Sequence, residues 1–136
     1  MPRPLTLDDA QRIAHTAVAE SKRRDVRTAV AVVDARGDLI VAMRLDGARY
    51  YYPDVAYGKA MASAMWEQDS RELARGPGVN SVQARVNGLN GGRMVFAGGA
   101  VPLRRDGAVV GAVGVGGSGP ESDEEIAKLA AQSLEA

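Results

Sequence analysis

Apolar residues that recur at helical spacing near the start of the chain predict a first helix. These residues are Ile13, Ala14, Ala17 and Val18. They share one side of a helix with 3.6 residues per turn, which gives the helix a face for packing on a sheet. Thr6, with Asp9 three residues later, has the form of a capping box in which an acid replaces the usual Glu or Gln. We therefore expect a helix over residues 7–22.

Two apolar stretches of strand length follow this helix. Residues 28–33 and 39–45 are rich in apolar and β-branched side chains, and the polar residues between them include Asp34 and Gly37. Turns of this composition join hairpin strands, because Gly adopts positive φ readily and Asp accepts hydrogen bonds from nearby amides. The pattern predicts a β-hairpin.

The second half of the chain contains three more apolar stretches, at residues 94–97, 100–103 and 108–115. The last two flank Asp106 and Gly107, a pair that is typical of tight hairpin turns. We expect a second hairpin there, with residues 94–97 as a further apolar stretch ahead of it.

The remaining segments predict two helices and a loop. Pro53 suits the first turn of a helix that we expect over residues 54–74. Residues 76–92 contain Gly-flanked polar stretches without a sustained period, so we interpret them as a long loop. Ser122, with Glu125 three residues later, forms a second capping box and predicts the start of a terminal helix.

The order of these elements predicts the fold class. Strands that are joined by hairpins, instead of alternating strictly with helices, favour an antiparallel sheet with helices packed against it. This is an α+β architecture. The chain has 136 residues, no repeat of fixed period and no linker, so we expect one domain over residues 1–136.

Composition excludes several classes of function. The 17 basic residues balance the 17 acidic ones, so no overall charge attracts nucleic acid. The lack of cysteine excludes disulfides, thiolate nucleophiles and thiolate metal sites. No apolar run reaches the length of a signal peptide or of a membrane span, so we expect a cytoplasmic protein without a membrane partner. The histidine and the carboxylates show neither metal-ligand spacing nor a catalytic triad, so we predict no metal site.

Three blocks of sequence together resemble the GlcG/HbpS-like family, also described as the PduO C-terminal-like or haem-degrading domain. Residues 27–48 read RTAVAVVDARGDLIVAMRLDGA, residues 54–64 read DVAYGKAMASA, and residues 98–127 read GGAVPLRRDGAVVGAVGVGGSGPESDEEIA. Their order and spacing match the family over essentially the whole chain. The resemblance implies a profilin-like fold with a five-stranded antiparallel sheet, assembly into homo-oligomers, and haem as the ligand of the best-described relatives.

Glycines at strand ends are candidates for a ligand rim. Glycine within a strand marks a bulge or a close approach by a backbone or a ligand. We expect Gly111 and Gly114 to serve packing beneath a helix. For the glycines at strand ends a ligand-facing role and a structural role are equally open: Gly98, Gly99, Gly116 and Gly117.

Lys59 is the lysine of the second family block, and small neighbours allow its stem to lie against the sheet. It can pair with a ligand carboxylate or with an acid of the core such as Asp34 or Asp46, so we expect a positioned side chain rather than a solvated one. Arg44 is a second candidate for binding an acidic group of a ligand.

Aromatic side chains are few, which draws attention to Tyr50, Tyr51 and Tyr52 in the loop before the second helix. Consecutive residues cannot all face the core, so we expect at least one tyrosine, Tyr50 or Tyr52, to contact a ligand or another subunit. Trp66 is a candidate for the core, for a subunit interface or for a pocket. His15, the single histidine, is expected to be partly buried, and the alternative is an axial haem ligand.

These residues support two hypotheses about function. The first is a haem-binding or related small-ligand protein in which glycines admit a flat molecule and Arg44 or Lys59 binds its carboxylates. The second is an isomerase, tautomerase or hydrolytic enzyme that uses Lys59 with Asp46 or Tyr50 for acid–base catalysis on a carboxylated metabolite. A structural homo-oligomer without a ligand is a further alternative.

Overall fold

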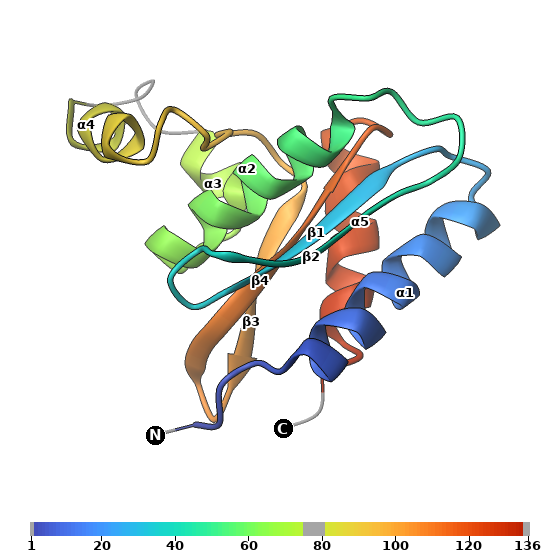
Figure 1. The fold of residues 1–136 in the computed structure, drawn as a ribbon, viewed down its shortest axis with the longest axis horizontal. Helices are drawn as coiled ribbons and strands as arrows, with labels where there is room; N and C mark the ends of the chain where they lie inside the picture. Colours follow the sequence, from blue (N-terminus) through green and yellow to red (C-terminus); the bar gives the residue numbers. More distant parts are fainter. Residues whose placement is uncertain (1, 75–80, 135–136) are drawn as a thin grey trace.

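The computed structural model describes residues 2–74 and 81–134 and contains a four-stranded antiparallel sheet of order β2-β1-β4-β3. The strands are β1 (Ala29–Asp34), β2 (Leu39–Arg44), β3 (Ala100–Arg105) and β4 (Ala108–Gly116). On one face of the sheet lie α1 (Leu7–Arg23) and α5 (Pro120–Ala131), and α2 (Tyr52–Trp66) crosses the other face (Figure 1). The short helices α3 (Ser70–Ala74) and α4 (Ser81–Leu89) follow α2. The predicted α+β class is confirmed.

The two faces of the sheet carry side chains of different size. Large residues point towards α1 and α5 and form the main core, among them Val30, Val32, Leu103 and Val113. The residues between them on β1 and β4 are mostly small, among them Ala29, Ala31 and Ala112. These residues pack against alanines of α2. Since side chains alternate between faces along a strand, the Ala-Val alternation of β1 specifies a thick core on one face and a close helix contact on the other.

Both predicted hairpin turns are confirmed. The Asp34 carboxylate accepts hydrogen bonds from the backbone N–H groups of Arg36 and Asp38, and Gly37 has a φ of 88°. In the turn between β3 and β4, Asp106 and Gly107 both have positive φ. The capping box of Thr6 and Asp9 is also present, because each side chain accepts a hydrogen bond from the backbone N–H of the other residue.

The expectation of a five-stranded sheet is wrong, because the described residues form four strands and residues 94–97 are not among them. This apolar stretch packs beside α2 and α3, where Met94 belongs to a cluster with Met61 and Leu73. Side chains, instead of a neighbouring strand, make hydrogen bonds to the backbone of this stretch. The Asn87 carboxamide accepts a hydrogen bond from the Met94 N–H, and the Ser70 hydroxyl donates to the Ala97 carbonyl.

The predicted helix over residues 54–74 is divided, and the predicted loop over residues 76–92 contains a helix. Helix α2 ends at Trp66, and its C-cap Glu67 has a left-handed φ of 56°. The N–H groups of Glu67 and Gln68 both donate to the Ser63 carbonyl. Helix α4 occupies Ser81–Leu89, and residues 76–80 of the predicted loop lie outside the described residues.

The predicted start of the last helix at Ser122 is also wrong. Helix α5 begins at Pro120 with Gly119 as its N-cap, and the cap makes no side-chain hydrogen bond. Proline tolerates the first turn, where its missing N–H has no helical partner. No helix in the described part of the chain is long and apolar enough to cross a membrane.

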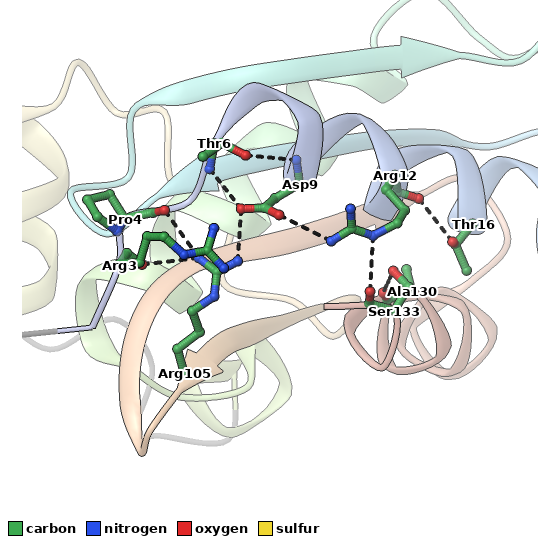
Figure 2. A network of polar contacts seen from close by, with 9 residues as sticks. All are labelled: Arg3, Pro4, Thr6, Asp9, Arg12, Thr16, Arg105, Ala130 and Ser133. Atoms are coloured by element: carbon green, nitrogen blue, oxygen red, sulfur yellow. Dashed lines mark hydrogen bonds and ion pairs between the residues drawn. The ribbon is translucent and has the colours of Figure 1, made fainter. Parts of the chain in front are cut away.

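A polar network holds the segment before α1 against the second hairpin (Figure 2). The buried guanidinium of Arg105 donates to the carbonyls of Arg3 and Pro4, 3.1 Å to each, and to the Asp9 carboxylate at 2.9 Å. Arg12 donates to the other oxygen of Asp9. Burial raises the pKa of Asp9, but the hydrogen bonds from the Thr6 backbone and the two guanidinium groups lower the pKa by more, so the net shift is downward.

This shift predicts a contribution to acid denaturation. A carboxyl group with a lower pKa in the folded protein than in the unfolded chain stabilises the fold above its unfolded value of 3.8, and this stabilisation is lost as the pH falls below that value. Asp9→Asn is expected to reduce the slope of the free energy of unfolding against pH between about pH 2 and 4. The reduction should correspond to up to about one proton taken up on unfolding. Urea titrations over this range measure the slope. Asp8→Asn, at an exposed position in the same turn, is the matched control, and an equal slope in both variants contradicts the prediction.

Candidate functional site

A buried ion pair lies at the end of the sheet where β4 runs into α5. The ammonium of Lys59 on α2 donates to the Val115 carbonyl and to the Asp123 carboxylate, at 3.1 Å in both cases. The exposed fractions of the two side chains are only 5% and 2%. The second oxygen of Asp123 accepts hydrogen bonds from the N–H and hydroxyl of Ser118. One carboxylate therefore joins α2, the loop after β4 and the first turn of α5.

Lys59 is positioned rather than solvated, as predicted, but the partners predicted for it within the core are wrong. Its acid is Asp123, neither Asp34 nor Asp46. Gly99 makes room for the ammonium, because a Cβ atom at Gly99 would lie 2.7 Å from the Lys59 Nζ atom.

The other strand-end glycines also lie against side chains of the chain itself. A Cβ atom at Gly117 would lie 2.7 Å from the ring of Tyr52, and one at Gly98 or Gly116 would lie 3.2 Å from Pro120 or Val55 respectively. The structure thus gathers Tyr52, Lys59 and the four predicted rim glycines at one end of the sheet. Each of the four glycines lies against a side chain of the protein.

The two glycines assigned to packing differ in their neighbours. Gly114 lies directly beneath α2, where a Cβ atom would meet the Ala56 carbonyl and Ala60, so the predicted helix crossing is confirmed. Gly111 faces the Val33 carbonyl of the neighbouring strand and the Leu5 side chain. The expectation of a helix over Gly111 is wrong.

The other predicted site residues lie elsewhere. Arg44 and Asp46 line a hollow of about 390 Å³ between α1 and the end of β2. Tyr50 is 82% exposed and makes an edge contact with Tyr51. Trp66 packs edge-on against Phe96 at the far end of α2, with ring centroids 5.9 Å apart. The proposed catalytic set of Lys59, Asp46 and Tyr50 is therefore divided between the buried ion pair, this hollow and an exposed loop.

His15 is exposed on α1, so the expectation that it is partly buried is wrong. Within residues 2–74 and 81–134, no cluster of three or more His, Asp and Glu side chains could hold a metal ion. At the end of the same helix, hydrogen bonds from Arg23 and Arg24 hold the pKa of Glu20 at about 2. Arg24 also bonds to Glu125 at 2.7 Å, which ties α1 to α5.

Another hollow, of about 560 Å³, lies between α2 and the start of β2. We call it the α2 hollow and define it by its lining residues, Leu39, Asp54, Tyr57 and Arg93. Leu39 pairs with Val33, which faces α2, so Leu39 points to the α2 side of the edge strand and remains 46% exposed. The hollow combines an apolar side chain, a half-buried phenol, a carboxylate and a guanidinium.

Gly58 lets the segment that carries Arg93 lie close to α2. A Cβ atom at Gly58 would collide with the Arg93 carbonyl and the Val95 side chain, so only glycine lets this segment approach α2 so closely. Sequence reasoning missed all four lining residues. The available signal was the Tyr57-Gly58 pair, an aromatic side chain beside the helix residue that admits another backbone.

Comparisons with known proteins give the family. The sequence model of the family described as haem degrading protein HbpS-like matches residues 5–132. The chain belongs to the HbpS-like family. An uncharacterized 15.0 kDa protein from the dhaT-dhaS intergenic region of Citrobacter freundii is 30% identical over 128 residues, which cover 93% of this chain and 89% of that protein.

Solved HbpS-like structures share the fold. A double mutant of Streptomyces reticuli HbpS is 29% identical with a TM-score of 0.84, and the match covers 100% of this chain and 90% of that one. A PduOC–haem complex is 26% identical with a TM-score of 0.84, and the match covers 98% of this chain and 96% of that one. The resemblance found in the three sequence blocks is confirmed, and one relative of this fold is known with haem bound.

Proposed function

We propose that this protein binds haem, or a related flat tetrapyrrole, in the α2 hollow. The observation that carries the proposal is the combination of groups lining this hollow, in a chain whose fold matches that of a PduOC–haem complex along nearly its whole length. A volume of about 560 Å³ lies within the range of small-molecule sites, roughly 300–1,000 Å³.

Three of the four lining residues, Leu39, Tyr57 and Arg93, can make a contact that haem requires. Leu39 and the Tyr57 ring offer apolar surface to a macrocycle. The Arg93 guanidinium is suited to a propionate carboxylate, to which it can donate two parallel hydrogen bonds. The phenol oxygen of Tyr57 could hold the haem iron, since tyrosine does so in some haem proteins. The chain has no cysteine, and its one histidine is exposed on α1, at the other face of the sheet.

The strand-end residues support this function indirectly. Lys59 and Asp123 neutralise each other and hold α2 in register above the sheet, so the helix that carries Asp54 and Tyr57 has a fixed position. The alternative of an acid–base enzyme built on Lys59, Asp46 and Tyr50 draws no support from the geometry, because the three groups do not share a site.

Titration with hemin tests the proposal. We expect the wild-type protein to show a saturable change in the Soret band. Tyr57→Phe keeps the ring and removes the oxygen, so it should alter the ferric spectrum, and Arg93→Ala should raise Kd about tenfold, or 1.4 kcal/mol.

Arg36→Ala is the matched control for the loss of an arginine, since Arg36 lies on the turn between β1 and β2 and lines a different hollow. It should bind hemin like the wild type. Absence of a saturable Soret change rejects haem as the ligand. An unchanged spectrum in Tyr57→Phe together with an unchanged Kd in Arg93→Ala removes the α2 hollow as the site.

A further inference from the structure

A third hollow, of about 530 Å³, lies at the opposite face of β2 from the α2 hollow. We call it the hairpin-end hollow. Its walls are the N-terminal residues Pro2 and Pro4, the turn after β1, Ile40 of β2 and the first residues of β4, Ala108 to Val110. Ile40 packs with the core between the sheet and α1, whereas Leu39 points to α2. The two hollows are therefore separated by the edge strand itself.

The lining of the hairpin-end hollow is apolar apart from Asp34 and Arg36, and both of these are engaged elsewhere. One carboxylate oxygen of Asp34 accepts the N–H groups of Arg36 and Asp38 in its own turn, at 2.9 and 3.1 Å. The Arg36 guanidinium faces the Asp38 carboxylate at 3.9 Å. The backbone of the turn satisfies the Asp34 carboxylate, and the Arg36 guanidinium is exposed beside Asp38, so apolar residues supply most of the contact surface of the hollow.

The N-terminal wall of this hollow is held in place by buried contacts. Arg105, only 3% exposed, donates to the carbonyls of Arg3 and Pro4 and is itself anchored by Asp9 (Figure 2). Leu5, the next residue, is buried in the main core. An arginine clamp on backbone carbonyls fixes the path of the chain while leaving the proline rings to line the hollow. The concave shape therefore exists before any ligand arrives, which reduces the ordering cost of binding.

We propose that the hairpin-end hollow is a binding site for a small, uncharged, apolar molecule, separate from the haem site. Its volume suits a molecule of one to three rings and lies within the usual range for small-molecule sites. Burial of apolar ligand surface against prolines, valines and Ile40 drives binding, at roughly 25 cal/mol per Å² of apolar surface removed from water. Nothing in this proposal depends on haem binding in the α2 hollow.

The test uses N-phenyl-1-naphthylamine, a neutral apolar dye whose fluorescence rises when it leaves water. We expect saturable binding to the wild-type protein. Ala108→Phe fills the hollow from the half-buried start of β4 and should raise the dye Kd at least about tenfold. Ala19→Phe, which adds the same ring at an exposed position on α1, should leave the dye Kd unchanged. Circular dichroism checks that both variants are folded.

A second variant keeps the test decisive if Ala108→Phe does not fold. Pro4→Ser removes a ring from the wall but keeps the carbonyl that Arg105 binds, and it should weaken dye binding severalfold. Equal dye affinity in the wild type, Ala108→Phe and Pro4→Ser overturns the proposal, as does the absence of saturable binding. A change in sedimenting mass of Ala108→Phe without dye binding to the wild type would instead identify the hollow as a contact between copies. Hemin titrations of the same variants should match the wild type, so failure here is distinguishable from failure of the haem proposal.

Discussion

Replacing Lys59 by methionine is expected to lower the free energy of unfolding by about 3–5 kcal/mol, the usual cost of removing one partner of a buried ion pair. Methionine has nearly the length of the lysine stem, so packing is largely kept and the loss is electrostatic. The Asp123 carboxylate would remain buried with hydrogen bonds from Ser118 alone. Denaturant titration of wild type and variant measures the difference.

A double variant separates charge from packing in this prediction. Lys59→Met with Asp123→Asn removes the stranded charge, while an amide oxygen can still accept the Ser118 hydrogen bonds. We expect the double variant to be more stable than Lys59→Met alone, so the losses of stability in the two single variants should not add. Lys59→Met should also weaken hemin binding, although Lys59 does not line the α2 hollow, because Lys59 holds in place the helix that carries Asp54 and Tyr57. A loss of stability below about 1 kcal/mol would contradict the assignment of Lys59 as the anchor of α2.

The parts of the fold that sequence predicted correctly are specified by residues close together in the chain. The Thr6–Asp9 capping box and the turns at Asp34–Gly37 and Asp106–Gly107 each depend on hydrogen bonds or backbone angles within four or five residues. The apolar and β-branched composition of residues 28–33 predicted a strand for the same reason. Local signals of this kind do not need tertiary structure to be interpreted.

The parts that failed depend on distant residues. The apolar stretch 94–97 has strand-like composition, but its backbone is bound by side chains of Asn87 and Ser70. The capping box at Ser122 is lost because the last helix starts earlier, at Pro120, and Asp123 inside its first turn is held by Lys59, 64 residues away. No local pattern reports such a partner.

The candidate site shows the same division. Sequence predicted a positioned role for Lys59 and a possible ligand rim at the strand-end glycines. In the structure Gly99 lies against Lys59 and Gly117 against Tyr52, while Gly98 and Gly116 lie against Pro120 and Val55. The α2 hollow combines Leu39, Asp54, Tyr57 and Arg93, which come from a strand edge, a helix and an extended segment. Only the crossing of α2 over the sheet brings these residues together, so the hollow follows from the fold and not from a motif.

The same crossing predicts a large effect at Gly114. A Cβ atom there would meet the Ala56 carbonyl and would lie 3.0 Å from the Ala60 N atom, and both neighbours are backbone of α2 that cannot rotate away. Gly114→Ala is therefore expected to lower the free energy of unfolding by about 1–3 kcal/mol, and Gly114→Val by more than that, because overpacking must lift the helix or bend the strand.

The cost at Gly114 opposes the ordinary gain from replacing glycine, which is about 0.4–1 kcal/mol where the backbone conformation allows it. Gly88, exposed in α4, provides the control, since a Cβ atom there meets nothing within 4 Å. Gly88→Ala should be neutral or stabilising in the same denaturant titration. Because α2 carries Asp54 and Tyr57, Gly114→Ala should also weaken hemin binding, whereas Gly88→Ala should not. Equal stability of the two alanine variants would mean that α2 does not rest on β4 as described.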